Sequence, residues 1–473
     1  MIKLMLGEVV GAIQGRPWGE LPTVSVGGVS IDSRTVTADD LFFAIPGQRF
    51  DGHDFVVDAL RGGAVAAVVS AARAAAVAER IRASDVRLPA SAVLIEVDDT
   101  VTALGRLAAY HRRQMATLVI AVVGSNGKTT TKAMIHHILG GRLRGRCSPQ
   151  SYNNAIGVPL TLLAAEQGDD YLVAEIGTNA PGEIAALGAI VEPDLAVVTC
   201  IAEEHLEGLG DLEGVAAEEC AILTKLRKNG FAAVNTDSPL VRRYLPSDGL
   251  HVATFGVDPA ADVRLSEARY EAPWLRFKLN ERFPFRVRMA GLHNAINAAA
   301  AVTVARRCGL DFPEAAARLE SFVPPPMRNE IIEIAGVTVV NDAYNANPRS
   351  ALAAIEVLEQ LPCRGQRVAV FGEMRELGVQ SAELHRRVAE RLRESGIQRV
   401  LLVGEASRLM EDVLASGGLF GPLVERCADL EECLERLSGT LRAGDVLLLK
   451  ASRAVALERL IEPLRARLPA AVG

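Results

Sequence analysis

The stretch "VIAVVGSNGKTTTKAM", residues 119–134, decides how the chain folds. An apolar, β-branched run leads into a glycine-containing loop, and a lysine and three threonines follow the loop. In a strand–loop–helix unit of this kind, the loop N–H groups and the helix N-terminus form a nest for phosphate oxygens. The alternative is a glycine turn beside a solvated lysine. Because a strand precedes the loop and a helix follows it, the stretch predicts a nucleotide-binding loop.

The loop positions have separate chemical roles in this prediction. Gly124 and Gly127 let the backbone approach the phosphates closely. Lys128 can reach the terminal phosphates, and the hydroxyl of Thr129 can hold Mg²⁺. The general pattern has a glycine where this chain has Val122, so the loop is the shorter G-x-x-G-K-T form.

Apolar runs of strand length continue on both sides of a proline connector. "LVIAVV", "YLVAEI", "DLAVVT" and "GFAAVN" are separated by helix-length segments, as are "VTVVND", "RVAVFG", "RVLLVG" and "DVLLLK" after "FVPPPMRNEI". Parallel strands that are buried on both faces have this composition. We therefore predict an α/β fold with three domains: residues 1–112, a central phosphate-loop domain with a parallel sheet at 113–326, and residues 327–473.

In "YNANPRSALAAIEVLEQL", Asn347 can cap a helix whose first residue is Pro348. This cap would begin the first helix of the third domain, directly after the strand "VTVVND".

The bulk properties exclude several classes of protein. The 473 residues carry a formal net charge of −7, which argues against a general binder of nucleic acid or of a membrane surface. The seven cysteines are odd in number and form no CxxC pair, so we expect a reducing cytoplasm rather than a disulfide framework. Every long apolar stretch is interrupted by charged residues, so no membrane insertion is expected.

Two polar residues follow other predicted strands of the central domain. Glu175 ends "YLVAE", and His205 lies just past "DLAVVT". Ligands bind at the carboxyl ends of the strands in open α/β sheets, so a carboxylate there could bind a metal that also touches the nucleotide. Alone, each would more often be structural. Together with Thr129 they indicate a metal site.

The chain resembles the Mur ligases, the ATP-dependent amide-forming enzymes of peptidoglycan synthesis. The combination of "YNNAIGVPLTLL", "EIGTNAPGEI" and "YNANP" is most similar to the members that add D-alanyl-D-alanine. Further matching stretches are "DSRTVTADDLFFAIPGQRFDGHDF", "GSNGKTTTK", "EEHLEGLGDLEGVA", "GLHNAINAAAA", "MRNEI", "VFGEMRELG" and "KASRAVALERLI".

The resemblance implies a fold and a reaction. The first domain would hold the UDP part of the substrate, the central domain ATP, and a Rossmann-like third domain would close over both. The carboxylate of UDP-MurNAc-tripeptide would take the γ-phosphoryl group of ATP, and the amine of D-alanyl-D-alanine would displace phosphate. Lys128 and Mg²⁺ would supply the positive charge that two approaching anions need. We expect a monomer with these small-molecule partners and no nucleic acid.

The resemblance also implies roles for individual residues. The catalytic set is Lys128, Glu175, His205, Glu219 and Arg328. The nucleotide-binding set is Gly124, Ser125, Asn126, Gly127, Lys128, Thr129, Thr130, Asn294, Asn297, Arg328, Asp342 and Tyr344. The substrate-binding set is Ser33, Arg34, Asp51, His53, Ser151, Tyr152, Asn153, Asn154 and Asn345. For Asn294 and Asn297 the alternative is a helix face with polar caps, and for Arg34 it is a surface ion pair.

One position departs from the family pattern. Many relatives carry a CO₂-modified lysine that ligates a second Mg²⁺, and Glu219 stands at the position aligned with it. Glu219 is also a carboxylate, on a shorter arm. The resemblance implies that Thr129 and Glu175 serve one Mg²⁺ and that His205 serves the second. We hypothesise that Glu219 supplies the anion at this second Mg²⁺ directly, without CO₂. The alternative is that Glu218 and Glu219 belong to a solvated helix face.

Other functions share the short phosphate loop. Folylpolyglutamate synthase and the ligase that adds the third peptide residue differ from this prediction in their amine acceptor. A phosphate-loop switch or motor would hydrolyse ATP without any amine acceptor. A silent nucleotide-binding module is disfavoured by the intact Lys128, Thr129 and Glu175.

Overall fold

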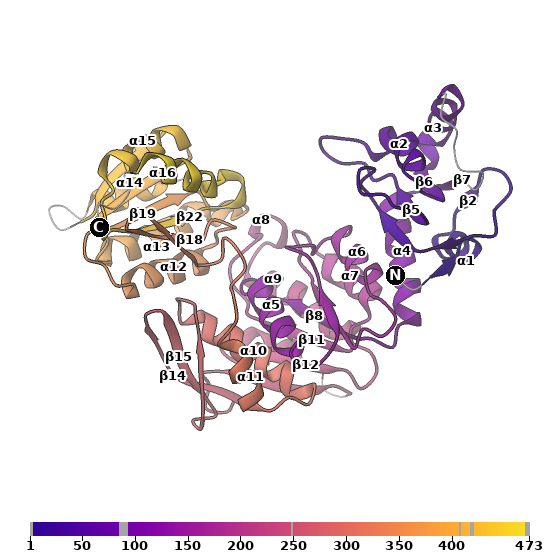
Figure 1. Cartoon of the computed structure of the whole chain (residues 1–473). Helices are drawn as coiled ribbons and strands as arrows, with labels where there is room; N and C mark the ends of the chain where they lie inside the picture. The colour runs from indigo at the N-terminus through magenta and orange to yellow at the C-terminus, as the bar shows by residue number, and fades with distance from the viewer. Residues whose placement is uncertain (1–2, 85–92, 247–248, 406–407, 417–420, 469–473) are drawn as a thin grey trace.

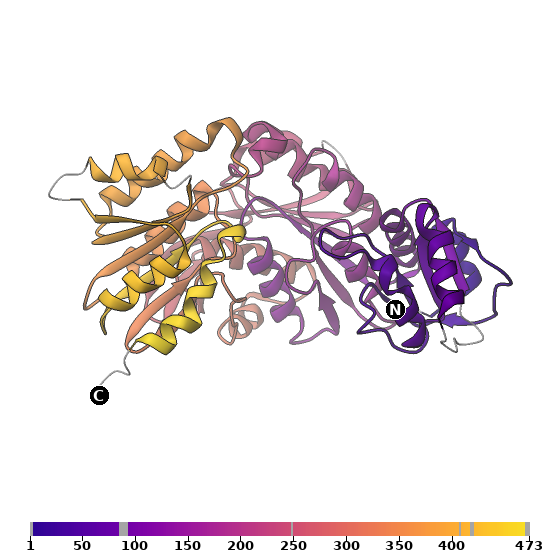
Figure 2. The same cartoon turned by 90° about the horizontal axis from the view of Figure 1, so that it is seen from above.

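The computed structural model describes residues 3–84, 93–246, 249–405, 408–416 and 421–468. The fold is α/β, as predicted, with a separate main sheet in each of three successive parts of the chain. Figure 1 shows the N-terminal part (indigo) and the C-terminal part (orange to yellow) on either side of the central part. Seen from above, the three parts form an elongated row (Figure 2).

The N-terminal part is built on a five-stranded sheet that is mostly parallel. Its spatial order is β2 (Arg16–Pro17), β7 (Val93–Val97), β6 (Ala66–Ser70), β5 (Asp40–Phe43) and β4 (Gly28–Ser30), with β2 antiparallel to β7. β1 (Leu4–Met5) and β3 (Ser25–Val26) pair separately. The helices of this part are α1 (Leu6–Ile13), α2 (Val56–Arg61) and α3 (Ala71–Ala83).

Helix α4 (Thr100–Gln114) leads from the N-terminal part into the central part. Near its end, Arg112 is fully buried and donates from Nε to Val191 O at 2.8 Å. Its Nη2 donates to Glu192 O at 2.8 Å and to Asp194 Oδ2 at 2.7 Å. The last turn of α4 is thus anchored in the central part. The domain boundary predicted at residue 112 lies inside this helix and stays a prediction.

The central part contains a nine-stranded sheet whose first six strands are parallel. In spatial order they are β9 (Gly145–Cys147), β10 (Tyr171–Glu175), β8 (Leu118–Val123), β11 (Leu195–Val198), β12 (Phe231–Asn235) and β13 (His251–Gly256). The strands predicted from the apolar runs are confirmed. β10 and β11 flank β8, so Glu175, the phosphate loop and His205 all follow strand ends at the same edge of the sheet.

β9, β13 and the rest of this sheet were not predicted from the sequence. β14 (Val263–Glu271) pairs with β13 at two positions, and β15 (Trp274–Leu279) and β16 (Phe283–Val287) continue from it in antiparallel fashion. Figure 1 shows β14 and β15 at the lower left, outside the helices of the central part.

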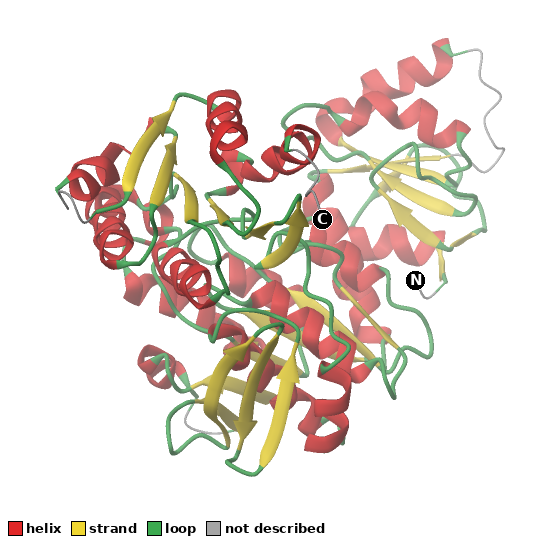
Figure 3. Ribbon diagram, turned by 60° about the vertical axis from the view of Figure 1, so that its left-hand side comes forward, coloured by secondary structure: helices red, strands yellow, loops and turns green. Residues whose placement is uncertain are grey.

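Helices cover both faces of the central sheet (Figure 3). They are α5 (Lys128–Leu139), α6 (Gly157–Leu163), α7 (Glu183–Val191), α8 (Leu206–Leu209), α9 (Leu212–Cys220), α10 (His293–Arg307) and α11 (Phe312–Leu319). The alanine-rich α10 packs closely on α5, and Ile135, Ile138 and Val302 share one apolar cluster there. Each buried CH₂ group contributes about 0.8 kcal/mol, so this packing holds the helix of the phosphate loop firmly in place.

The C-terminal part has a six-stranded sheet, parallel except for its first strand. Its order is β17 (Glu330–Ile334), β18 (Val337–Asn341), β22 (Val446–Lys450), β19 (Arg367–Gly372), β20 (Arg399–Val403) and β21 (Leu423–Cys427). Its helices are α12 (Pro348–Gln360), α13 (Ser381–Glu394), α14 (Arg408–Ala415), α15 (Leu430–Thr440) and α16 (Ile461–Arg467). The predicted cap of α12 is confirmed, since the Asn347 side chain accepts from Ser350 N at 2.9 Å.

Within the described ranges, no helix combines the length and the apolar character needed to cross a membrane.

Candidate active site

A cavity of about 1260 Å³ lies where the three parts of the chain meet. The N-terminal part contributes Gln48 and Arg49, and the central part contributes the phosphate loop, Glu175, Glu204 and His205. The C-terminal part contributes Arg328, Asp342, Tyr344, Asn345, Asn347, Glu376 and Lys450.

The phosphate loop between β8 and α5 requires glycine at two positions. Gly124 has a φ of +118°, and a Cβ there would lie 2.3 Å from Thr199 Oγ1. Gly127 has a φ of +86°, and a Cβ there would lie 2.3 Å from Asn297 Oδ1. Residues with a Cβ rarely adopt such φ values, and the neighbouring atoms leave no space for a Cβ. The loop conformation therefore depends on both glycines.

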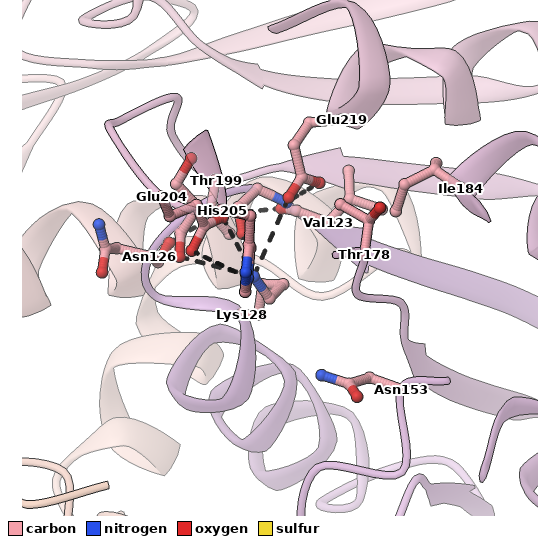
Figure 4. A network of polar contacts seen from close by, with 12 residues as sticks. Val123, Asn126, Lys128, Asn153, Thr178, Ile184, Thr199, Glu204, His205 and Glu219 are labelled. Atoms are coloured by element: carbon pink, nitrogen blue, oxygen red, sulfur yellow. Dashed lines mark hydrogen bonds and ion pairs between the residues drawn. The ribbon is translucent and has the colours of Figure 1, made fainter. Parts of the chain in front are cut away.

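Lys128 is not a solvated lysine. Its Nζ donates to Gly124 O at 2.6 Å and lies 3.7 Å from Glu204 Oε1 and 4.0 Å from Glu219 Oε1 (Figure 4). Burial alone would lower the pKa of Lys128, but the carboxylates of Glu204, Glu219 and Glu175 outweigh it and raise the pKa. The Lys128 side chain is 15% exposed, so the lysine is a mostly buried cation beside acidic side chains with which it makes no close contact.

The two carboxylates beside Lys128 are fully enclosed. Glu219 Oε2 accepts from Gly124 N at 2.7 Å, while Glu219 Oε1 and Glu204 Oε1 are buried without a hydrogen-bond donor. Burial raises the pKa of Glu204 to about 8, although Lys128 acts in the opposite direction. Burial likewise raises the pKa of Glu219. Two buried acidic oxygens thus lack a partner next to a phosphate-binding loop.

Glu218 and Glu219 do not lie on a solvated helix face, so that alternative was wrong. Both side chains are buried at the end of α9. Glu218 accepts from Gly182 N and Ile184 N, each at 2.7 Å, and so caps the start of α7. Glu219 points the other way, to the phosphate loop. The two neighbouring glutamates therefore have different roles.

Glu175 is buried at the end of β10. Its Oε2 lies 3.0 Å from Lys132 Nζ, and its Oε1 accepts from Asn153 Nδ2 at 3.2 Å. Lys132 also donates to the carbonyl oxygen of Gln150. Glu175 thus borders the cavity. Its charge is partly neutralised by Lys132, which lies on α5 one turn after Lys128.

His205 occupies a strained position just before α8, with a φ of +51°. Its Nδ1 contacts Glu376 Oε2 of the C-terminal part, and its Nε2 lies 3.9 Å from Glu204 Oε2. Burial lowers the pKa of His205, and Lys128 lowers it further, whereas the contact with Glu376 acts in the opposite direction.

These oxygen donors fit a divalent cation only in part. In the described ranges no group of three or more His, Cys, Asp or Glu side chains is arranged to hold a metal ion. However, carboxylate and hydroxyl oxygens are the ligands that Mg²⁺ prefers, and Glu204 and Glu219 each have one buried oxygen without a donor. Of these two residues, Glu204 lines the cavity, whereas Glu219 lies behind the phosphate loop and does not line it.

The C-terminal part contacts the phosphate loop directly. Arg328 Nη2 donates to Thr129 Oγ1 at 2.9 Å, and its guanidinium carbon lies 4.0 Å from the centre of the Tyr344 ring. The side-chain amides of Asn126 and Asn347 exchange two hydrogen bonds, of 3.2 and 3.1 Å. These contacts bring four of the predicted nucleotide-binding residues together across the two parts.

A buried ion pair lies behind these contacts. Lys450 Nζ lies 2.5 Å from Asp342 Oδ2 and donates to Asn345 O at 2.8 Å. Asp342 Oδ1 also accepts from Asn329 N at 3.1 Å. This pair joins the end of β22 to the segment after β18 that carries Tyr344.

Asn294 and Asn297 are buried on α10 rather than exposed as polar caps. Asn294 donates to Ala290 O at 2.8 Å and accepts from Asn297 Nδ2 at 3.0 Å. Both residues line the cavity beside Gly127. The structure therefore brings them next to the phosphate loop.

Several predicted residues do not line the cavity: Gly124, Thr129, Glu219, Ser33, Arg34, Asp51, His53, Ser151 and Tyr152. Asn153 and Asn154 do line it. Arg34 forms a surface ion pair with Asp32 at 2.7 Å, which was the alternative interpretation.

His53 is buried in the N-terminal part. Its Nε2 accepts from Ser70 N at 3.0 Å, and its Nδ1 lies 2.6 Å from Asp51 Oδ1. It therefore holds Asp51 in place.

The sequence analysis missed several cavity residues: Glu204, Asn347 as a loop contact, Glu376 and Lys450. Glu204 directly precedes His205, so its place after β11 was a usable signal. Glu376 lies 171 positions from His205, and no local pattern indicates that contact. Lys450 ends a predicted strand, where ligand-binding residues are common.

Comparisons with known proteins agree with this architecture. Residues 25–112 match the model described as Mur ligase family, catalytic domain, residues 122–305 the Mur ligase middle domain, and residues 327–453 the Mur ligase glutamate ligase domain. The UDP-N-acetylmuramoyl-tripeptide–D-alanyl-D-alanine ligase of Bacillus subtilis is 33% identical over 97% of both chains. The Escherichia coli enzyme of the same name is 32% identical over 98% of this chain and 99% of its own.

Two solved structures are similar over nearly the whole chain. MurF from Acinetobacter baumannii has a TM-score of 0.85 at 28% identity, covering 98% of this chain and 99% of its own. MurF ligase from Thermotoga maritima in complex with ADP has a TM-score of 0.76 at 29% identity, covering 93% and 97%. With near-complete coverage in sequence and structure, this chain belongs to the Mur ligase family and groups within it with the UDP-N-acetylmuramoyl-tripeptide–D-alanyl-D-alanine ligases.

Proposed function

We propose that the protein is an ATP-dependent ligase that joins D-alanyl-D-alanine to the terminal carboxylate of UDP-MurNAc-tripeptide in peptidoglycan precursor synthesis. The observation that carries the proposal is the buried Lys128 in a glycine-dependent phosphate loop, at the floor of a cavity walled by all three parts of the chain. The relatives that match over nearly the full length bear the name of this activity.

The reaction begins with two anions. The substrate carboxylate attacks the γ-phosphorus of ATP, the bond from that phosphorus to the bridging oxygen breaks, and ADP leaves. Lys128 stabilises the charge on the transferred phosphoryl group, since an ammonium group in a water-poor cavity acts more strongly than in bulk water. Arg328, which already touches Thr129, adds a second positive charge on the other side of the loop. The product of this step is an acyl phosphate.

The amine of D-alanyl-D-alanine then attacks the acyl carbon, phosphate leaves, and an amide bond remains. An acyl phosphate hydrolyses readily, so water must be kept out at this stage. The contacts of Arg328 and Asn347 with the loop bring the C-terminal part over the cavity and serve this purpose.

ATP is the expected nucleotide, and the similar T. maritima structure holds ADP. We propose that Gly124–Thr130 surround its phosphates, and that Asn294 and Asn297 lie near its adenine and ribose. Asp342 and Tyr344 complete the nucleotide site from the C-terminal part. Bound Mg²⁺ would neutralise phosphate charge, with Thr129 and Glu175 as ligands of one ion and His205 and Glu219 as ligands of a second.

Glu219 is the residue that distinguishes this metal site. Its buried Oε1, which lacks a donor, lies 4.0 Å from Lys128 Nζ and supports a direct role in cation binding without CO₂. No lysine replaces it within α9 (Leu212–Cys220).

For the UDP-tripeptide, we propose the N-terminal loop residues Ser33, Arg34, Asp51 and His53 together with the segment 151–154. Asn345 would face the substrate from the C-terminal part. The three-domain division at residues 112 and 326 matches this distribution of tasks. We further propose that the protein acts in the cytoplasm as a monomer, which its seven free cysteines suit.

The test is a coupled assay of ADP release with purified protein. ADP release should require both UDP-MurNAc-tripeptide and D-alanyl-D-alanine. Release with free glutamate, diaminopimelate or lysine as acceptor would assign the chain to another amide ligase. Release with ATP alone at the same rate would indicate a switch or motor ATPase.

A further inference from the structure

We propose that Glu376, in the loop after β19, is a positioning residue for His205. It contacts Nδ1 of the His205 ring and so directs Nε2 to the phosphate loop, where Glu204 Oε2 lies 3.9 Å away. Figure 4 shows His205 beside Glu204 and Lys128. The part of this inference that concerns Mg²⁺ rests on the proposed function.

The contact joins two residues with unfavourable backbone conformations. His205 has a φ of +51° and Glu376 a φ of +64°, although neither is a glycine. Such conformations are strained and persist only where the surroundings hold them. Their side chains meet each other. Two independent strained residues that converge on one contact indicate that the contact itself is important.

The backbone supports the same approach. Glu207 N donates to Glu376 O at 3.1 Å. Two residues later, Gly378 has a φ of +55°, and a Cβ there would lie 3.3 Å from Glu207 Cα. The loop after β19 therefore lies directly against the start of α8. The backbone that carries the Glu376 carboxylate is held in place by these contacts.

The chemistry of the contact fixes the histidine tautomer. An ionised carboxylate can only accept hydrogen bonds, so Nδ1 must carry the proton when it contacts Glu376. In a neutral ring the lone pair is then on Nε2, the nitrogen that faces Glu204 and the cavity. A carboxylate that orients a histidine in this way is a common partner of metal-binding histidines.

The contact connects two parts of the chain that are far apart in sequence. Glu376 belongs to the C-terminal sheet region, whereas His205 follows β11 of the central sheet. The histidine is therefore held in its binding-ready tautomer only when the C-terminal part is seated on the central part. Seating of that part and completion of the cation site become a single event, which prevents phosphoryl transfer in an open, wet cavity.

Arg387 offers a matched control, because it contacts Glu203, two residues before His205. Arg387 Nη1 lies 3.0 Å from Glu203 Oε1, so this contact links α13 to the loop after β11. Replacing Arg387 removes one of several contacts between the same two parts without touching the His205 ring, so the C-terminal part should stay seated. The control separates positioning of the His205 ring from the general attachment of the C-terminal part to the central part.

The first measurement uses the protein without nucleotide or metal. The ring nitrogens of its eight histidines are labelled with ¹⁵N, and His205 is assigned by the signals that disappear in His205→Gln. We expect a protonated Nδ1 and an unprotonated Nε2 in the wild type and in Arg387→Ala. In Glu376→Ala the two signals should move towards an average of both tautomers. Glu376→Gln, whose amide oxygen still accepts, should restore the wild-type pattern.

The second measurement is Mn²⁺ binding in the presence of ADP, followed by the electron paramagnetic resonance of free Mn²⁺. Glu376→Ala should weaken Mn²⁺ binding about tenfold, as loss of a supporting carboxylate typically does, and Arg387→Ala should leave it unchanged.

Three results would overturn the inference: averaged tautomers in the wild type, unchanged ring signals in Glu376→Ala, or equal losses of Mn²⁺ binding in both variants. The proposed function fails separately, if the wild type does not join the dipeptide to the UDP-tripeptide.

Discussion

Lys128 and Lys450 both lie beside acidic residues inside the protein. Only Lys450 has an acidic partner within hydrogen-bonding distance. Lys450 lies 2.5 Å from Asp342 and donates to Asn345 O, so its charge is neutralised within the protein. Lys128 reaches its carboxylates only at 3.7 and 4.0 Å and donates to the carbonyl of its own loop. The difference separates a charge that holds the structure together from a charge that is available to a ligand.

The acidic partners show the same contrast. Both carboxylate oxygens of Asp342 have a partner, whereas Glu204 and Glu219 each keep one buried oxygen without a donor. Burying an unpaired polar atom costs about 1–3 kcal/mol. The cluster around Lys128 therefore keeps unsatisfied acceptor oxygens that the Asp342–Lys450 pair lacks, as expected for a site that becomes satisfied when a phosphate and a cation bind.

Replacing Lys128 should have the largest effect on turnover. Lys128→Met removes the cation that faces the transferred phosphoryl group, so we expect turnover to fall about 10³-fold or more with little change in Tm. Single-turnover ADP release and thermal unfolding measure the two quantities. Full-speed ligation by this variant would contradict the comparison.

Replacing Lys450 should lower the stability of the fold. Lys450→Met leaves Asp342 buried and unpaired, so we expect a loss of about 3 kcal/mol in the free energy of unfolding. Urea unfolding measures this loss. The double variant Asp342→Asn/Lys450→Met is the control and should recover part of it. Equal losses in the single and double variants would show that the pair does not act as a unit.

Glu219 should control the cation requirement. Glu219→Gln keeps the size of the side chain but removes the charge, so the Mg²⁺ concentration for half-maximal turnover should rise about tenfold or more. The wild type should be equally active with and without added CO₂. An unchanged Mg²⁺ titration, or a wild type that needs CO₂, would refute the direct role of Glu219.

The smallest effect is expected at Arg34. Its ion pair with Asp32 is highly exposed, and such pairs contribute little to stability. Arg34→Ala should therefore leave Tm unchanged. If Arg34 contacts the UDP group, the KM for the UDP-tripeptide should rise severalfold at constant kcat. An unchanged KM would reduce Arg34 to an ordinary surface residue.

Much of the central sheet could be predicted because its strands are apolar on both faces. β8, β10, β11 and β12 appear in the sequence as uninterrupted runs, and the Asn347–Pro348 cap is equally local. β14–β16 were missed because their side chains alternate between buried and exposed positions around charged residues. The period-2 pattern was present, but no apolar run indicated it.

The partners of the site residues could not be predicted, because they come from distant positions. The pairing of Asn126 with Asn347 spans 221 positions, and that of Arg328 with Thr129 spans 199. Such contacts depend on how the C-terminal part sits on the central part. The different roles of Glu218 and Glu219 likewise depend on the direction in which each side chain leaves α9.

The most direct test of the central claim follows an oxygen atom. UDP-MurNAc-tripeptide labelled with ¹⁸O in its terminal carboxylate is converted with ATP and D-alanyl-D-alanine, and the released phosphate is analysed by mass spectrometry. If the carboxylate is activated as an acyl phosphate at Lys128, each phosphate released by the wild type carries one labelled oxygen. Unlabelled phosphate released along with the amide product would contradict the account.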